Sequence, residues 1–227
     1  SSSSDNPTVT ANSRTVTWAV TDANSAGACT SVGVTSTIGI NAVNDAPTTG
    51  NKTLSATEDT AYIFSSDNFS FSDVEGDNIS KVKITTLESA GTLYVDADND
   101  DTYDSGEDVT LNQEVAISNI ANLQFIAASN ANGTSYATFG FKVSDGIAWS
   151  ESAGTITINV AAVNDAPTAV NKTLSAAEDT VYTFSSSDFL FSDVDGDSIS
   201  KIKITTLENA GTLYVDADND DTYDSGE

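Results

Sequence analysis

Residues 96–107 carry six carboxylates in a twelve-residue stretch, and their spacing is that of ligands for a hard cation. Counted from Asp96, acidic side chains stand at positions 1, 3, 5, 9 and 12, and position 7 offers a backbone carbonyl. This order of oxygen ligands is typical of a calcium-binding loop, and many flexible carboxylates favour calcium over magnesium. No Lys or Arg lies between Lys83 and Lys142 to offset the charge, so a bound cation is expected. The expected ligands are Asp96, Asp98, Asp100, the carbonyl of Thr102, Asp104 directly or through water, and Glu107.

The loop departs from the helical form of this motif in two ways. Position 6 holds Asp101 where the motif has Gly, although Asp tolerates left-handed backbone better than most residues. The flanks 91–95 and 109–111 read as strands, so we expect an EF-hand-like loop in a β context; a solvated acidic hairpin is the alternative. The same twelve residues recur unchanged at 216–227, where the expected ligands are Asp216, Asp218, Asp220, Thr222, Asp224 and Glu227.

Smaller acidic clusters recur at the same spacing in two parts of the chain. Each cluster taken alone is ordinary turn chemistry, because Asp, Asn and Gly are the usual turn residues. Their joint recurrence suggests a role beyond turn formation. In the first part they are Asn44, Asp45, Glu58, Asp59, Asp73, Glu75 and Asp77, and in the second Asn164, Asp165, Glu178, Asp179, Asp193, Asp195 and Asp197.

The recurrence reflects an internal repeat that organises the chain. Residues 41–107 and 161–227 differ at 13 of 67 positions, at an offset of 120 residues. We therefore expect a complete repeat at 44–163 and the N-terminal half of the next repeat at 164–227. Residues 1–43 resemble the later strands of 44–163 loosely, and we interpret them as the C-terminal half of a preceding immunoglobulin-like repeat.

The elements that must position these acidic residues are expected to be strands. Apolar and β-branched residues alternate with a period of two, and clusters of Asp, Asn, Gly and Ser separate the runs. Several short strands in a repeat of about 120 residues predict an all-β chain of tandem immunoglobulin-like β-sandwiches. One short helical turn is expected at 117–121. The expected strands are 60–64, 79–85, 91–95, 123–126, 136–143 and 155–160.

Composition excludes several classes of function. The formal net charge of -26 is incompatible with binding to nucleic acid or to an anionic membrane surface. The chain has no His, which rules out Ser-His and Cys-His catalysis, and its lone Cys29 cannot form an internal disulfide. No apolar run is long enough to insert into a membrane, and no signal pattern or initial Met is present, so we interpret the chain as a piece of a longer protein. We expect a protein that is not an enzyme.

The order of the motifs resembles a known family. Glu-Asp-Thr, Phe-Ser-Asp-Val-Glu-Gly-Asp, Val-Ser-Asp-Gly and Val-Asn-Asp-Ala-Pro follow one another as in the bacterial cadherin-like tandem repeats of large secreted RTX-type adhesins. The resemblance covers 44–227. It implies a cadherin-like sandwich with Ca²⁺ held between successive domains, by Asn44 and Asp45 together with Glu58, Asp59, Asp73, Glu75 and Asp77. It also implies that Asp145 serves the following junction with Asn164 and Asp165.

The resemblance implies a structural extender: a stalk repeat, stiffened by calcium, of a secreted bacterial cell-surface adhesin or surface filament. Its expected partners are calcium and the neighbouring repeats of the same chain. The alternative is a carbohydrate- or protein-binding module that uses exposed aromatic residues such as Trp149 or Tyr103, whereas Trp18 is expected in a core. The partial repeats at both ends reflect either the limits of the sequence or head-to-tail self-association by strand exchange.

Overall fold

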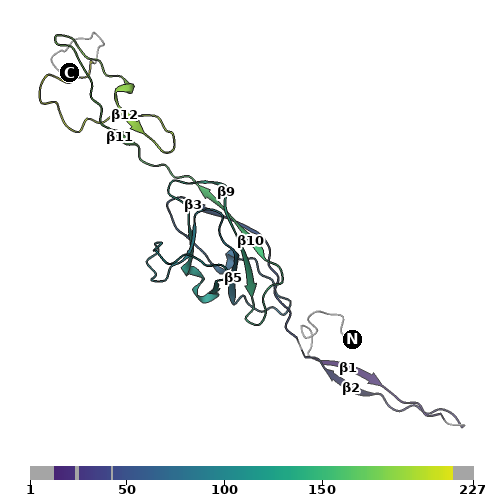
Figure 1. The fold of residues 1–227 in the computed structure, drawn as a ribbon. Coiled ribbons are helices and arrows are strands. Elements are labelled where there is room, and N and C mark those ends of the chain that lie inside the picture. Colours follow the sequence, from purple (N-terminus) through teal and green to yellow (C-terminus); the bar gives the residue numbers. More distant parts are fainter. Residues whose placement is uncertain (1–12, 24–25, 42, 217–227) are drawn as a thin grey trace. The chain divides into compact units, whose positions relative to one another are not determined.

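The computed structural model describes residues 13–23, 26–41 and 43–216, and almost all of its regular structure is β (Figure 1). By its contacts the chain divides into two compact units, Ser1–Val163 and Asn164–Glu227. Its strands lie in several separate sheets, and its few helical segments are short 3₁₀ turns. The expectation of an all-β chain is confirmed.

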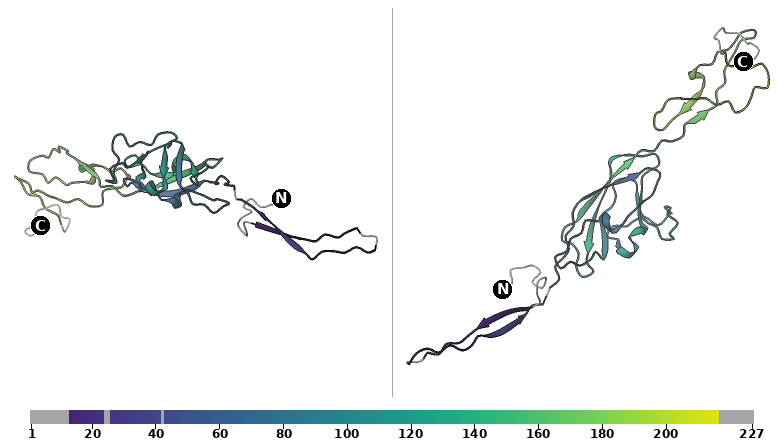
Figure 2. Two further views of the ribbon diagram at one scale, coloured as in Figure 1. Left: turned by 90° about the horizontal axis from the view of Figure 1, so that it is seen from below. Right: turned by 180° about the vertical axis from the view of Figure 1, so that it is seen from behind.

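Residues 43–163, all described, fold into two sheets that share one core (Figure 2). The larger sheet has the strand order β3-β10-β9-β5-β7, and the smaller has the order β4-β8-β6. Within the larger sheet, β3 and β10 run parallel, whereas β10–β9, β9–β5 and β5–β7 are antiparallel. The elements are β3 (Lys52–Thr57), β4 (Tyr62–Ile63), η1 (Ser66–Asn68), β5 (Lys81–Thr86), β6 (Thr92–Val95), β7 (Glu114–Ala116), η2 (Ile117–Asn122), β8 (Leu123–Ile126), β9 (Gly133–Ser144) and β10 (Gly154–Ala161).

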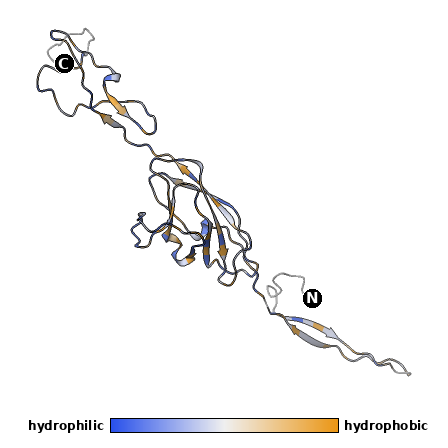
Figure 3. Cartoon of the chain, in the orientation of Figure 1, coloured by the Kyte–Doolittle hydropathy of each residue, from blue (hydrophilic) through white to orange (hydrophobic). Residues whose placement is uncertain are grey.

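The core follows from the alternation of side chains along the strands. Every second residue of β9 from Ala137 to Val143 is buried, as are Ile156, Ile158 and Val160 of β10. Aromatic rings join the elements, since Phe64 and Phe69 pack against Phe139 and Phe141 with centroids 5.7 and 5.1 Å apart. The hydropathy colouring shows the apolar residues on these strands (Figure 3). Burial of these apolar groups supplies most of the driving force for folding.

The expected strand pattern is wrong in three places: β3 and β7 were not expected, and a strand expected at 109–111 does not form. Strand β3 was not expected, because its sequence Lys-Thr-Leu-Ser-Ala-Thr holds small and polar residues, and its pairing with β10 supplies its order. Residues 109–111 do not form a strand; the pairing after the acidic loop is limited to a single bridge between Tyr94 and Asp108. The short turn expected at 117–121 is confirmed as η2.

The N-terminal described segment forms an isolated hairpin of β1 (Ser13–Trp18) and β2 (Val34–Gly39). Trp18 is 47% exposed and donates a hydrogen bond from its indole nitrogen to Ser36 Oγ. The expectation that Trp18 lies in a core is therefore wrong. A two-stranded hairpin has no second layer of its own to cover the apolar face of a strand.

In its described residues, the second unit repeats the short elements at the start of the first unit but not its longer strands. It contains β11 (Thr168–Val170), η3 (Ser186–Asp188) and β12 (Leu190–Ser192), and β11 pairs with β12 in the same way that Thr48 pairs with Ser72. Residues 172–177 and 201–206, which correspond to β3 and β5, form no strands.

Candidate metal centre

The acidic loop 96–107 is anchored at both ends to β6. The Val95 amide donates to the Glu107 carbonyl at 2.9 Å, so the first and last candidate ligands meet across the base of the loop. Asp96 directly follows Val95, the last residue of β6, and its backbone amide donates to the Asn122 carbonyl at 2.8 Å. Strand geometry therefore brings positions 1 and 12 together, where a helical version of the motif would use two helices.

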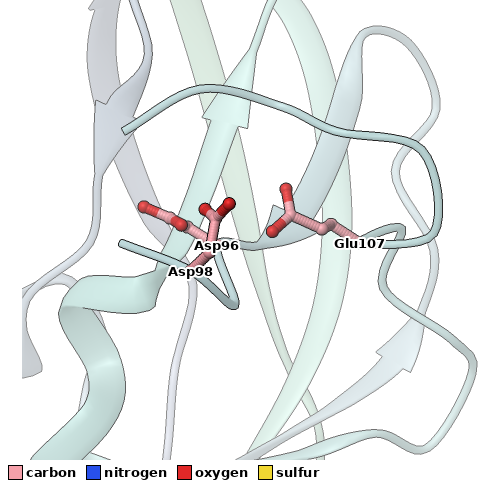
Figure 4. Close-up of side chains that lie close together, drawn as sticks. All are labelled: Asp96, Asp98 and Glu107. Carbon is pink, nitrogen blue, oxygen red and sulfur yellow. The ribbon is translucent and has the colours of Figure 1, made fainter. Parts of the chain in front are cut away.

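The carboxylates of the loop converge into two overlapping groups. One consists of Asp96, Asp98 and Glu107, with carboxylate oxygens all within 4.8 Å of one another, and the other consists of Asp98, Asp100 and Asp104. Figure 4 shows the first group, with Glu107 reaching in from the far end of the loop. Five of the six predicted ligands in this loop thus fall into these two groups. Within each group the oxygens lie at separations that one bound cation could bridge. The role of the Thr102 carbonyl stays a prediction.

Backbone amides hold Asp96 in place. Its side chain is only 2% exposed, and its two oxygens accept hydrogen bonds from the amides of Asn99 and Asp101 at 2.7 and 3.0 Å. Asn99 and Asp101 both have positive φ, 62° and 61°, so the turn at position 6 is made by an Asp in the left-handed region. The expected tolerance of Asp for this conformation is confirmed.

Glu107 closes the loop in a similar way. Its two carboxylate oxygens accept hydrogen bonds from the amides of Ala97 and Asp104 at 2.7 and 2.9 Å. Thr102 donates to Asp100 from both its amide and its hydroxyl, at 2.8 and 2.6 Å. The loop is thus arranged largely by its own backbone. Each Glu107 oxygen accepts one of these hydrogen bonds and keeps a lone pair for another ligand, whereas Asp100 Oδ1 accepts both hydrogen bonds from Thr102.

Mutual repulsion is visible in the electrostatics of the loop. The neighbouring Asp100 carboxylate raises the pKa of Asp98 above its usual value, with smaller contributions from burial and from Glu107. The pKa of Asp100 is lowered, because Thr102 donates hydrogen bonds to its charged form. Burial and the nearby Asp96 raise the pKa of Tyr94 at the base of the loop. A site with this excess of negative charge favours either a proton or a metal cation.

Sequence reasoning missed a buried polar network beneath the loop. Gln124 of β8 is fully buried; its amide group donates to Asp96 and Asp101 at 3.2 Å, and its oxygen accepts a hydrogen bond from Tyr94 at 2.9 Å. Asn122 adds a hydrogen bond to the Asp96 carbonyl at 2.9 Å. A Gln inside the apolar run Leu-Gln-Phe-Ile was the available signal, because a polar side chain in a buried strand needs a partner.

The weaker acidic residues of residues 43–163 fall into two separate groups, although the resemblance implied one. The Asn44 side chain donates to Asp145 at 2.9 Å, and the Asp45 amide donates to Glu75 at 3.2 Å. The Asp73 carboxylate accepts hydrogen bonds from the backbone amides of Glu75 and Asp77. One buried oxygen of Asp73 and one of Glu75 have no hydrogen-bond partner. Six candidates therefore lie together beside the Asn44-Asp45 linker, and we name them the linker cluster: Asn44, Asp45, Asp73, Glu75, Asp77 and Asp145.

Asp145 was expected at the following junction, and that expectation is wrong. The bridge between Ser144 and Trp149 ends the β9 ladder in a tight turn, and Asp145 accepts the amides of Ile147 and Ala148 at 2.6 and 2.7 Å. Burial acts to raise the pKa of Asp145, but these hydrogen bonds and the one from Asn44 outweigh it and lower the pKa.

Glu58 and Asp59 form the other group, next to the end of the unit. Glu58 is 1% exposed and accepts hydrogen bonds from the Val163 amide at 2.7 Å and from Asn132 at 3.0 Å. Asp59 accepts the amide of Asn130 at 3.2 Å. These two residues therefore lie near Val163, the residue before the second Asn-Asp linker, and not with Asn44 and Asp45.

The second unit reproduces the linker cluster in outline. The Asp165 amide donates to Asp195 at 2.8 Å, and Asp193 accepts the amides of Asp195 and Asp197 at 3.0 Å. Asn164 bonds the Asp165 carbonyl as Asn44 bonds that of Asp45. Glu178 and Asp179 are exposed. Asp216 is half-buried, and the remaining ligands predicted at 218–227 lie outside the described residues.

Comparison with known proteins gives no assignment. No family model matches the chain, and no significant similarity was found to a curated protein or to a solved structure. None of the helices in the described part of the chain has the length and apolar character needed to span a membrane.

Proposed function

We propose that this chain is a calcium-stiffened structural extender, a stalk segment of a secreted bacterial surface adhesin or filament built from tandem immunoglobulin-like repeats. The observation that carries the calcium part of the proposal is the convergence of Asp96, Asp98 and Glu107 within 4.8 Å at the base of one loop. The repeated sequence and its resemblance to cadherin-like adhesin repeats support the stalk role.

The physical role of calcium follows from the charge. A chain of net charge -26 repels itself. Among the described residues, no Lys or Arg forms an ion pair with any of the six carboxylates of loop 96–107. Binding of Ca²⁺ would reduce that repulsion and join the two ends of the loop. Extracellular calcium modules bind with dissociation constants of about 10⁻⁴–10⁻³ M, so such a site fills outside the cell and stays empty in the cytosol.

The linker cluster supports a second class of site. Its unpartnered oxygens of Asp73 and Glu75 are buried beside the Asn-Asp linker, where a cation would satisfy them. A metal bound there would restrict the linker, which is the property a stalk needs.

Calorimetric titration of the full chain with Ca²⁺, and in parallel with Mg²⁺, tests the proposal. Asp98→Asn is the informative variant, because the Asp98 side chain lies in both carboxylate groups of the loop. Asp67→Asn is its control, since Asp67 is exposed, outside every candidate group, and loses the same charge.

We expect Ca²⁺ to bind more tightly than Mg²⁺ and to raise the melting temperature. Asp98→Asn should lower the number of bound calcium ions by one relative to Asp67→Asn. An unchanged melting temperature on addition of chelator, together with no heat of calcium binding, would refute the calcium role.

A further inference from the structure

The sequence contains a single Asn-Gly pair, Asn132-Gly133, and it lies at the start of β9. Gly has no Cβ, so its backbone nitrogen can approach the side chain of the residue before it with the least steric hindrance. Asn132 is exposed, which leaves its side-chain amide open to water. An exposed Asn followed by Gly is therefore the arrangement in which the backbone most readily attacks a side-chain amide.

The backbone around this pair is held only loosely by the sheet. Strand β10 pairs with β9 at Ala137 and next at Gly133, so residues 134–136 have no partner in that ladder. Gly133 has a φ of 145°, outside the range of ordinary strand residues, and nearby Asn130 also has a positive φ. The ladder therefore does not fix the peptide before Gly133 in the geometry of a strand interior.

The Asn132 side chain makes a contact that its conversion to a carboxylate would reverse. Its amide group donates a hydrogen bond to Glu58 at 3.0 Å, and Glu58 is only 1% exposed. The other oxygen of Glu58 accepts a hydrogen bond from the Val163 amide at 2.7 Å, directly before the second Asn-Asp linker. A carboxylate in place of the donor would set two like charges against each other at a buried position, where their repulsion is strong.

We propose that Asn132-Gly133 is a self-modification site, at which the chain deamidates without an enzyme and thereby loosens the hold of Glu58 on Val163. The Gly133 nitrogen, after losing its proton to solvent, attacks Asn132 Cγ; the N–Cγ bond forms, the Cγ–Nδ2 bond breaks, and ammonia leaves. Water then opens the resulting cyclic imide at either carbonyl, which gives an aspartate or an isoaspartate residue. The proposal concerns covalent ageing of the repeat and does not depend on calcium binding.

Incubation of the full chain in mildly alkaline buffer, followed by peptide mass mapping, tests the chemistry. Asn130 is the internal control, because Ala131, which follows it, carries a side chain that hinders attack. Asn132→Gln is the control variant, since its longer side chain keeps the amide but disfavours closure of the small ring. We expect the mass gain of an NH₂-to-OH replacement at Asn132, none at Asn130, and none at position 132 in Asn132→Gln. An intact Asn132, or equal conversion of Asn130, would overturn the proposal.

Thermal melting tests the structural consequence. Asn132→Asp mimics the product, and Asn119→Asp is its matched control, because Asn119 is exposed and its side chain bonds that of Ser118. Relative to this control, Asn132→Asp should lower the melting temperature by at least about 4 °C, and equal melting temperatures would refute the loss of the Glu58 contact. Should Asn132→Asp fail to fold, hydrogen exchange at the Val163 amide of the incubated parent chain decides. Faster exchange than before incubation supports the proposal, and unchanged exchange refutes it.

Discussion

The two copies of the repeated sequence adopt different structures, although 203–206 and 83–86 are identical. In the first unit this segment is β5, between β7 and β9; in the second it forms no strand and exposes Ile204. Features that depend on neighbours in sequence survive in both copies, such as the 3₁₀ turns η1 and η3 and the turns around Asp73 and Asp193. Strand formation in this chain is thus decided by cross-strand partners more than by local propensity.

The largest expected effect comes from the matched pair Ile84→Asp and Ile204→Asp. Ile84→Asp buries an unpaired carboxylate in the core and should destabilise residues 44–163 by more than about 4 kcal/mol. Ile204→Asp changes an exposed side chain and should leave the same transition within about 0.5 kcal/mol. Urea unfolding followed by the fluorescence of Trp149 measures both. Comparable losses in the two variants would show that the second unit shares the core of the first.

An intermediate effect is expected for Glu58→Gln against Glu178→Gln. Buried Glu58 accepts two donors, from Val163 and Asn132, and the amide of Gln would leave one of them facing another donor. The expected loss is about 1–3 kcal/mol, whereas exposed Glu178 should tolerate the change. Thermal melting of the two variants gives the comparison. A Glu58→Gln variant as stable as the parent would mean that this contact to Val163 contributes nothing.

The smallest effect is a pH dependence that only one copy should show. The Ser65 amide donates to the uncharged Asn68, while at the same place in the second copy the Ser185 amide donates to Asp188. The hydrogen bond from Ser185 lowers the pKa of Asp188. Because this carboxyl has a lower pKa when the turn is formed, its stabilisation is present above the ordinary pKa of Asp and is lost as the pH falls through the lowered value.

Amide chemical shifts followed by NMR during acid titration test this difference. The Ser185 signal should move as Asp188 takes up a proton. The Ser65 signal should stay in place, because its acceptor Asn68 has an amide instead of a carboxyl group. A Ser65 signal that moves together with that of Ser185 would point to a global change of the fold.

Much of the first unit could be predicted from the sequence, because its strands carry alternating apolar residues. The segments 123–126 and 155–160 are found within β8 and β10 as expected. The convergence of Asp96, Asp98 and Glu107 was also predictable, since these residues lie in one loop. The separation of Glu58 from Asn44, and the position of Asp145, were not, because contacts across about 100 residues depend on sheet order. The exposure of Trp18 had the same cause, since burial requires a second layer that no local pattern encodes.

The parallel pairing of β3 with β10 has a mechanical consequence. The chain enters the unit at the start of β3 and leaves it at the end of β10, and six residue pairs from Lys52–Ile156 to Thr57–Ala161 join the two strands. Because the strands are parallel, these two points lie at opposite ends of the ladder. Tension along the backbone therefore loads the ladder in shear, and its hydrogen bonds must rupture together rather than unzip one at a time.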